Sequence, residues 1–323
     1  MQAVPQNVIS DGSPAIKMVI KVLSQKCIEL RILPSFGYIM TVKRNKTKIR
    51  KASGEIVDFN EGKLQRSLKR SGANVNSIAS IIKEISNNLY EGISTKEIYK
   101  KAFAMLRKQS HPTAARYKLK QAIYELGPSG FPFEKFVAEI LKQEGYKTRV
   151  GVIVNGHCVN HEVDVIAQKD AQHFMVECKF HSQQGRNCDV KIPLYINSRF
   201  IDVEKSWKKM LGHEVKFHQG WIYTNTRFTG DAIQYSSCSG LKLVSWDYPK
   251  TESLRERINT LGLHPLTCLT TLTRNEKTKL LEKDIVLCMD LCQRPKLLDI
   301  IGVNKSRHKK ILNEASELCK NIK

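Results

Sequence analysis

The sequence of 323 residues contains no run of about 18 consecutive apolar residues, the length that a membrane-spanning helix needs. It also has no secretory signal with a clear cleavage site. Its nine cysteines are scattered and lack the spacing of a disulfide scaffold. Cys288 and Cys292 have no second pair or nearby histidines to complete a zinc site, so core thiols are expected. These absences argue against a membrane protein or a disulfide-rich secreted domain and favour the reducing cytoplasm.

Acidic residues are scarce relative to basic ones. The chain has 31 Asp and Glu against 53 Lys and Arg, a formal net charge of +22 at pH 7. Such an excess predicts an anionic partner, with nucleic acid the leading candidate, although a generally basic surface is the alternative. The length predicts more than one domain and is sufficient for a sizeable core.

Two predicted strands in the middle of the chain carry the candidate chemistry. Residues 161–167 alternate between polar and apolar side chains, and residues 173–180 form a second strand after a short polar turn. Side chains two residues apart share one face of a strand. Glu177 and Lys179 are therefore expected to point the same way, and Asp164 can meet them from the neighbouring strand.

Two carboxylates and a lysine at one place have a chemical use. Asp164 and Glu177 can bind one Mg²⁺ through oxygen ligands. The metal polarises a phosphate and helps to deprotonate a bound water. Lys179 can orient that water or stabilise the charge that develops on the phosphate. The alternative is an exposed strand with a surface ion pair.

The pattern Asp-x(n)-Glu-x-Lys resembles the core of the PD-(D/E)xK nucleases, which have the restriction-endonuclease-like fold. Val163 stands where that family often has proline. An amphipathic helix at residues 130–141 and a strand at 148–154 precede the two strands, as in the family, and the helix is most similar to that of the Mrr-type enzymes. The resemblance implies a mixed sheet flanked by helices, with Glu134 as a further outer ligand and catalytic helper.

Residues 48–126 have a different pattern. Two strands around a Ser-Gly turn lead into a helix capped by Asn60, and three more helices follow from Val75, Ser94 and Pro112. Ser94 and Glu97 have the spacing of a capping box. This β-hairpin plus four helices resembles the ATP-cone, a nucleotide-binding regulatory domain.

The ATP-cone resemblance implies that ATP or dATP binds here. The family's phosphate-contacting lysines correspond to Lys51 and Lys63, with Asn60 and Thr95 as weaker correspondences. Ala52 occupies a position where the family often has arginine. Two alternatives therefore stay open: the domain has kept its fold but lost its ligand, or its positive charge serves to bind DNA.

The expected organisation is multidomain, combining α+β and α/β parts. Residues 1–40 are a poorly defined leader, with a plausible start at Met40; an ATP-cone-like domain at 41–127, a nuclease-like domain at 128–250 and a small all-α module at 251–323 follow. In the last module, an Ile-Gly-Val turn followed by Lys305, Arg307, Lys309 and Lys310 resembles a helix-hairpin-helix.

Together these patterns predict a cytoplasmic, Mg²⁺-dependent DNA endonuclease regulated by ATP or dATP. A catalytically silent, nucleotide-responsive DNA-binding regulator is the main alternative, and an RNA-processing nuclease fits the charge equally well. A homo-oligomer is compatible with the sequence, which does not reveal its order or the DNA target.

Overall fold

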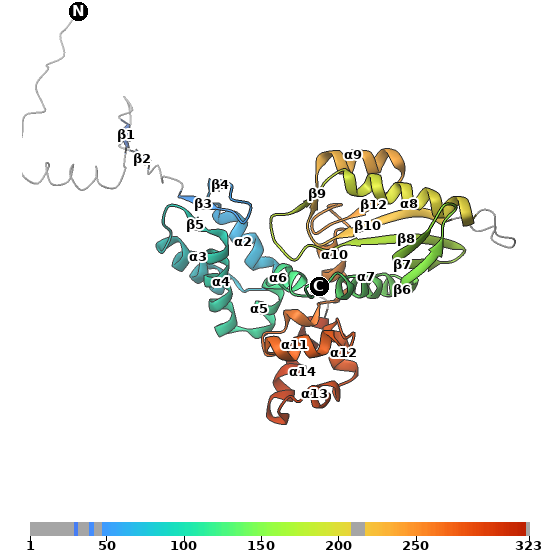
Figure 1. Cartoon of the computed structure of the whole chain (residues 1–323). Coiled ribbons are helices and arrows are strands. Elements are labelled where there is room, and N and C mark those ends of the chain that lie inside the picture. The colour runs from blue at the N-terminus through green and yellow to red at the C-terminus, as the bar shows by residue number, and fades with distance from the viewer. Residues whose placement is uncertain (1–28, 32–38, 42–46, 208–216, 321–323) are drawn as a thin grey trace, which may run out of the picture.

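The computed structural model describes residues 29–31, 39–41, 47–207 and 217–320 (Figure 1). Most of the predicted leader lies outside the described residues. The two described pieces of it, β1 (Glu29–Arg31) and β2 (Ile39–Thr41), pair antiparallel with each other. Among the described helices, none has both the length and the apolarity required to cross a bilayer.

The N-terminal part (47–126) is a small three-stranded sheet covered by helices. Its elements are β3 (Lys48–Arg50), β4 (Ile56–Asp58), α2 (Glu61–Arg70), α3 (Val75–Asn87), β5 (Ile93–Ser94), α4 (Thr95–Gln109), α5 (His111–Tyr117) and α6 (Leu119–Tyr124). The predicted hairpin is present, and β5 adds a third strand parallel to β3. The predicted fourth helix is divided at Lys118, which ends α5 and precedes α6.

Local capping explains where these helices begin. Asn60 accepts a hydrogen bond from the Lys63 backbone N–H, as predicted. Ser94 accepts one from the Glu97 N–H, but the predicted capping box is only half formed. The Glu97 carboxylate accepts a hydrogen bond from the Tyr90 hydroxyl at 2.8 Å, because Tyr90 precedes β5 and lies within reach.

The central part (131–244) is built on a five-stranded sheet in the order β12-β10-β8-β7-β6. Its elements are α7 (Phe131–Gln143), β6 (Lys147–Asn155), β7 (Asn160–Lys169), β8 (Gln172–Lys179), β9 (Asn187–Cys188), α8 (Lys191–Trp207), β10 (Phe217–Thr224), β11 (Arg227–Phe228), α9 (Gly230–Ser239) and β12 (Lys242–Val244). Strands β6, β7 and β8 are antiparallel neighbours, whereas β10 is parallel to both β8 and β12. The sheet is therefore mixed, as the sequence predicted.

Helices cover both faces of this sheet. Helix α7 packs on one face, and α8 and α9 lie on the other (Figure 1). Residues 174–178 of β8 are consequently all buried, although the sequence suggested one polar face. A charged side chain in the middle of this strand must therefore find its partners inside the protein.

The C-terminal part (254–319) is helical. It comprises α10 (Leu254–Leu261), the 3₁₀ turn η1 (Leu266–Cys268), α11 (Arg274–Leu281), α12 (Cys288–Gln293), α13 (Leu297–Ile300) and α14 (Lys305–Cys319). Its apolar side chains join one continuous core with those of α5, α6 and α7 and one face of the central sheet. This core crosses the predicted boundary at Gly127, because Leu126 and Phe133 on its two sides are both fully buried in it.

Candidate active site

The predicted carboxylates meet where β7 and β8 stop pairing. The last paired residues on this side are Val165 and Val176. Beyond them, Asp164 Oδ2 accepts a hydrogen bond from the Cys178 backbone N–H at 2.7 Å. A side-chain carboxylate thus satisfies a backbone donor at the end of the ladder, and this fixes Asp164 beside the strand that carries Glu177.

Glu177 is the most buried of the predicted site residues, at 3% exposure. Its Oε1 accepts from Lys179 Nζ at 2.5 Å, and its Oε2 accepts from Arg199 Nη1 at 2.7 Å. The guanidinium of Arg199 also donates to the backbone carbonyl of Glu162. Two cations therefore neutralise a carboxylate that would otherwise be costly to bury.

Sequence reasoning did not identify Arg199. The residue lies on α8, three residues after Ile196 and four before Val203, both fully buried. This spacing places Arg199 on the buried stripe of the helix. A charged residue on an otherwise apolar face of a helix indicates a buried partner of opposite charge, and this pattern could have identified Arg199 from the sequence.

Glu134 approaches the site from the first turn of α7. Burial raises the pKa of its carboxyl to about 7, and the negative charges of Asp164, Glu162 and Glu177 act in the same direction. Burial likewise raises the pKa of Asp164 to about 6, with a further contribution from Glu177. The three predicted acidic residues thus interact electrostatically, and two of them retain protons to unusually high pH.

Lys179 is half-buried beside these acids. Burial opposes its charge, but the carboxylates of Glu177 and Asp164 outweigh this effect and raise the pKa of the ammonium group. The lysine is therefore a permanent cation at neutral pH. Its position suits the stabilisation of a negative charge on a phosphate next to Asp164 and Glu177.

Two residues at the end of β10 hold the backbone around Lys179. Thr224 Oγ1 donates to the Lys179 carbonyl at 2.7 Å. The Asn225 side chain accepts from the His181 N–H at 2.9 Å and donates to the His181 carbonyl at 2.8 Å. Both side chains are fully buried, so they position the segment that follows the lysine, a role that sequence reasoning left unassigned.

The donor set suits a hard divalent cation in its chemistry. Carboxylate oxygens are the preferred ligands of Mg²⁺, and the raised pKa values of Glu134 and Asp164 show that burial and the neighbouring carboxylates outweigh the nearby cations. Within the described residues, no three His, Cys, Asp or Glu side chains are already arranged around a single metal position. The pair of Asp164 and Glu177 is in place, but both oxygens of Glu177 are engaged with Lys179 and Arg199.

The four predicted nucleotide-binding residues occupy two ends of the N-terminal sheet. Arg50 of β3 pairs with Ser94 of β5, so Lys51 and Thr95, which directly follow them, lie at one end of the sheet. Asn60 and Lys63 follow the opposite end, where Asp58 of β4 pairs with Lys48. Three strand residues separate the ends by about 10 Å, so a nucleotide that touches all four must extend along the sheet.

The lysines of this candidate nucleotide site are accessible. Lys63 is exposed, and the largely accessible Lys51 forms an ion pair with Glu55 at 2.9 Å. A bound phosphate would therefore compete with Glu55 for Lys51. Such an exposed pair contributes little to stability, so exchanging its partner costs little free energy.

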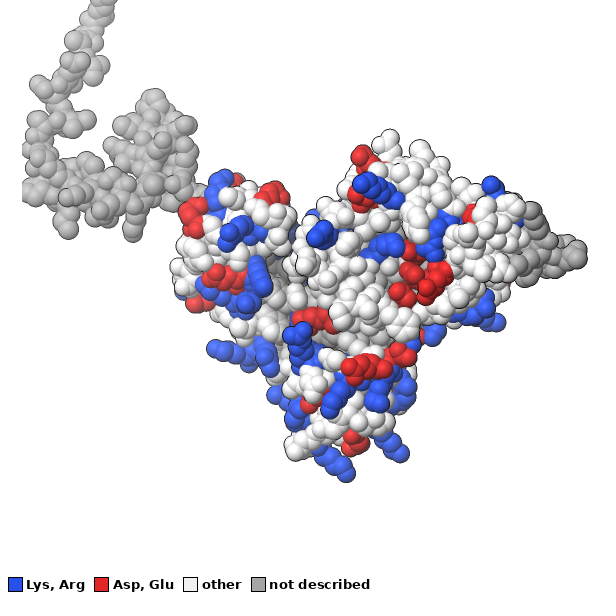
Figure 2. Space-filling model, viewed as in Figure 1, with Lys and Arg blue, Asp and Glu red and all other residues white. Residues whose placement is uncertain are grey.

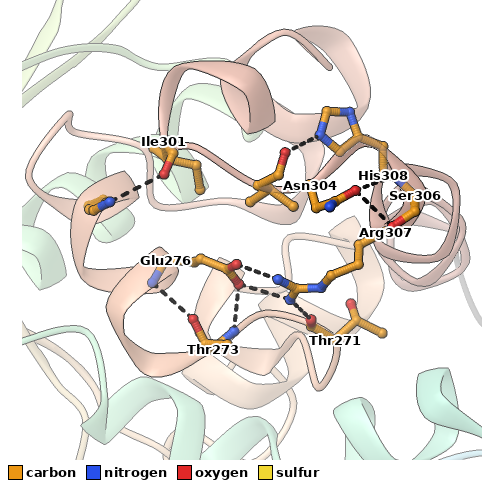
Figure 3. Close-up of polar contacts among 10 residues, drawn as sticks. Thr271, Thr273, Glu276, Ile301, Asn304, Ser306, Arg307 and His308 are labelled. Atoms are coloured by element: carbon orange, nitrogen blue, oxygen red, sulfur yellow. Dashed lines mark hydrogen bonds and ion pairs between the residues drawn. The ribbon is translucent and has the colours of Figure 1, made fainter.

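The predicted helix-hairpin-helix is formed by α13, the Ile301-Gly302-Val303 turn and α14 (Figure 3). Gly302 adopts a φ of 79°, which favours glycine. Lys305, Lys309 and Lys310 are exposed, as expected for phosphate contacts. Arg307 is different, because its guanidinium is bound within the module.

Figure 3 shows Arg307 turned toward α11. Its Nη1 pairs with Glu276 Oε1 at 2.5 Å, and its Nη2 donates to the Thr271 carbonyl at 2.7 Å. The carboxylate of Glu276 also completes a capping box with Thr273. Arg307 therefore joins α14 to α11, while its side chain stays 38% exposed.

The surface charge is uneven. Figure 2 shows acidic side chains gathered where β6, β7 and α7 lie, with basic side chains beside them. Elsewhere on this face, and most densely over the helical C-terminal part, Lys and Arg predominate. An acidic centre within a basic surface is compatible with a cation-assisted reaction on a polyanion.

Comparisons with known proteins agree with this division of the chain. Family models match at residues 47–122 (ATP cone domain), 128–248 (restriction endonuclease, Mrr catalytic type) and 264–319 (AF1548-like, C-terminal). An uncharacterized protein of Archaeoglobus fulgidus is 33% identical over 183 residues, which are 56% of this chain and 99% of that protein. The crystal structure of AF1548, a protein of unknown function, is also 33% identical and gives a TM-score of 0.49 over 59% of this chain and 98% of that one. The chain therefore belongs to the family of this Archaeoglobus protein, and it combines an ATP cone domain with an Mrr-type restriction-endonuclease-like domain and an AF1548-like C-terminal domain.

Proposed function

We propose that this protein is a Mg²⁺-dependent endonuclease that hydrolyses phosphodiester bonds of DNA under the control of ATP or dATP. The observation that carries the proposal is the meeting of Asp164, Glu177 and Lys179 at the end of two paired strands in a restriction-endonuclease-like domain. The net charge of +22 supports a polyanionic substrate.

Each residue has a distinct part in the proposed reaction. Asp164 and Glu177 would hold the cation, and Glu177 would exchange one of its present partners for it. A bound Mg²⁺ would polarise the phosphate and acidify a water. Lys179 stabilises the charge that grows on the phosphate, and Glu134, with a pKa of about 7, can accept the proton of the attacking water near neutral pH. Arg199 is a positioning residue that holds Glu177.

A contact between domains supports nucleotide control. The loop that follows Lys179 packs against the β3–β4 turn: a Cβ on Gly185 would lie 3.4 Å from Ser53 Cα and 3.5 Å from the Ala52 carbonyl. Gln184 in the same loop donates to the side chain of Gln121 at 2.8 Å. Because the β3–β4 turn begins directly after Lys51, a phosphate bound there could shift the loop that leaves the active site.

Nicking of supercoiled plasmid tests the catalytic proposal. The full chain is incubated with Mg²⁺ or Mn²⁺, with and without ATP or dATP. The Asp164→Ala and Lys179→Ala variants should lose at least 100-fold of the nicking rate, whereas Lys147→Ala, which removes an exposed lysine of β6, should stay within twofold. Loss in all three variants, or nicking that survives in the first two, would contradict the proposed site.

Nucleotide control has its own test. The ratio of nicking rates with and without ATP should move toward one in Gln184→Ala, because the contact to Gln121 is lost. The neighbouring Gln183→Ala serves as the control and should keep the wild-type ratio. An unchanged ratio in Gln184→Ala would show that nucleotide does not act through this contact.

The silent regulator remains the second candidate function. It is favoured by the pairing of both Glu177 oxygens with basic side chains, which leaves this carboxylate neutralised without a metal. Gel-shift binding of DNA with no cutting under Mg²⁺ or Mn²⁺ would support it. A panel of RNA substrates in the same assay distinguishes an RNA-processing nuclease from a DNA endonuclease.

A further inference from the structure

A large cavity lies where the three parts of the chain meet. Its volume is about 1130 Å³, and its wall combines residues of α4 and α6, the 127–129 linker, the start of α7, η1 and α11. In Figure 1 these segments converge near the middle of the molecule. We call this space the junction cavity. It is separate from Asp164 and Glu177 and from the four predicted nucleotide-binding residues, none of which lines it.

The polar end of the junction cavity has more cations than counter-charges. The Thr267 carbonyl accepts hydrogen bonds from Lys277 Nζ at 2.9 Å and from Lys118 Nζ at 3.1 Å. Glu125 pairs with Lys118 at 2.5 Å. Lys277 thus donates to a neutral carbonyl, its largest electrostatic interaction is with Lys118, and Glu125 offsets this repulsion only in part.

This arrangement is costly for the protein without a ligand. Lys277 is only 9% exposed, and a buried ammonium that shares a single carboxylate with a second lysine is unfavourable. Burial, followed by the charge of Lys118, lowers the pKa of Lys277 to about 8. An anionic group that entered the cavity would add a second negative charge to a cluster of two lysines and one glutamate.

Apolar side chains line much of the remaining wall, together with the charged Arg107, Arg274, Glu282 and Asp284. Phe103 and Tyr124 come from the N-terminal part, Phe131 from the beginning of α7, and Leu272 and Leu281 from the C-terminal domain. A concave wall that combines apolar side chains with charged and polar groups is typical of small-molecule sites. The volume accommodates a ligand of this kind with an aromatic or aliphatic body.

We propose that the junction cavity binds a small organic anion. Its acidic group is held by Lys277 and Lys118, and its apolar body packs against Phe103, Tyr124 and Leu272. These contacts come from the N-terminal and C-terminal parts of the chain, so binding of the ligand stabilises their present arrangement. The inference does not depend on catalysis, because no residue of the candidate active site takes part.

Two fluorescent dyes of nearly the same shape test the proposal on the full chain at pH 7. 1-Anilinonaphthalene-8-sulfonate carries an anionic group, and N-phenyl-1-naphthylamine lacks it. We expect saturable binding of the sulfonate at one site, at least tenfold tighter than that of the neutral dye. Lys277→Met should weaken the sulfonate at least tenfold and change the neutral dye less than twofold. Lys283→Met, an exposed lysine just beyond α11, should change neither.

The outcomes against the proposal are equally specific. Equal affinity for the two dyes, or wild-type affinity for the sulfonate in Lys277→Met, would overturn it, as would the same loss in Lys283→Met, which would indicate binding to the basic surface. If Lys277→Met does not fold, Ser129→Trp replaces it. This variant places a bulky ring in the cavity from the exposed linker and should abolish binding of both dyes; unchanged binding there would refute the site.

Discussion

Replacing Asp164 by asparagine should make the metal-free protein more stable while it removes activity. The carboxyl has its pKa raised from 3.8 to about 6 by burial and by Glu177. About two pKa units correspond to at most about 3 kcal/mol of destabilisation by the ionised form. Asparagine is isosteric, and its amide oxygen can still accept the Cys178 N–H, so little else is lost.

The stability difference between Asp164→Asn and the wild type should grow as the pH rises. Between about pH 4 and 6 the folded protein binds the Asp164 proton and the unfolded chain does not, so the wild type loses stability as the pH rises across this window. The advantage of Asp164→Asn should therefore be small at pH 4 and complete at pH 8. There we expect a gain of about 1.5 to 3 kcal/mol, or roughly 2–4 °C in Tm for a chain of this length.

Thermal unfolding in EDTA and in Mn²⁺ is the measurement. Mn²⁺ should raise the Tm of the wild type at pH 8 and have little effect on Asp164→Asn, because the cation restores the favourable environment that the carboxylate lacks. Asp170→Asn is the matched control, since Asp170 is exposed in the β7–β8 turn at a φ of 54° that asparagine tolerates. A variant that is no more stable than the wild type at pH 8 without metal, or equal stabilisation of both by Mn²⁺, would refute the reasoning.

Three further predictions follow from the same contacts. Nicking with Mg²⁺ should increase as the pH rises through about 7, where Glu134 loses its proton, and a pH–rate profile of Glu134→Gln should lack this step; a persisting step would assign it to another group. Arg199→Lys should lower kcat about tenfold with little change in KM in steady-state nicking, because one ammonium cannot bridge Glu177 and the Glu162 carbonyl; a change confined to KM would argue instead for a DNA contact. Lys277→Met should raise the Tm at pH 7, since it removes a buried ammonium with a pKa of about 8, and a series of melts should show the gain shrinking from pH 8 to 10.5; a pH-independent gain would implicate packing alone.

Local patterns in the sequence were sufficient for most of the fold. Two-residue alternation predicted β7 and β8 and placed Glu177 and Lys179 on one face, and the caps at Asn60 and Ser94 marked the helix starts that the structure shows. These features depend on residues a few positions apart, so a single sequence contains the information.

Features that depend on distant contacts were not predicted. Arg199 lies 22 residues from Glu177, and Asn225 lies 44 residues from His181, so neither partnership is visible from spacing. Arg307 was grouped with the basic residues after the turn, and its ion pair with Glu276, 31 residues earlier in the chain, was not predicted. In each case tertiary packing decides the partner of a charged or amide side chain.

The unbroken core around Leu126 and Phe133 limits how the chain can move as a whole. The N-terminal half could rotate about a hinge at residues 127–130 only if these side chains left their apolar surroundings. At roughly 2 kcal/mol for each large side chain that returns to water, such an opening is too expensive for an ordinary effector to drive. A nucleotide bound in the N-terminal half must therefore act through a small local displacement. Cutting the chain at this point would expose apolar surface on both fragments.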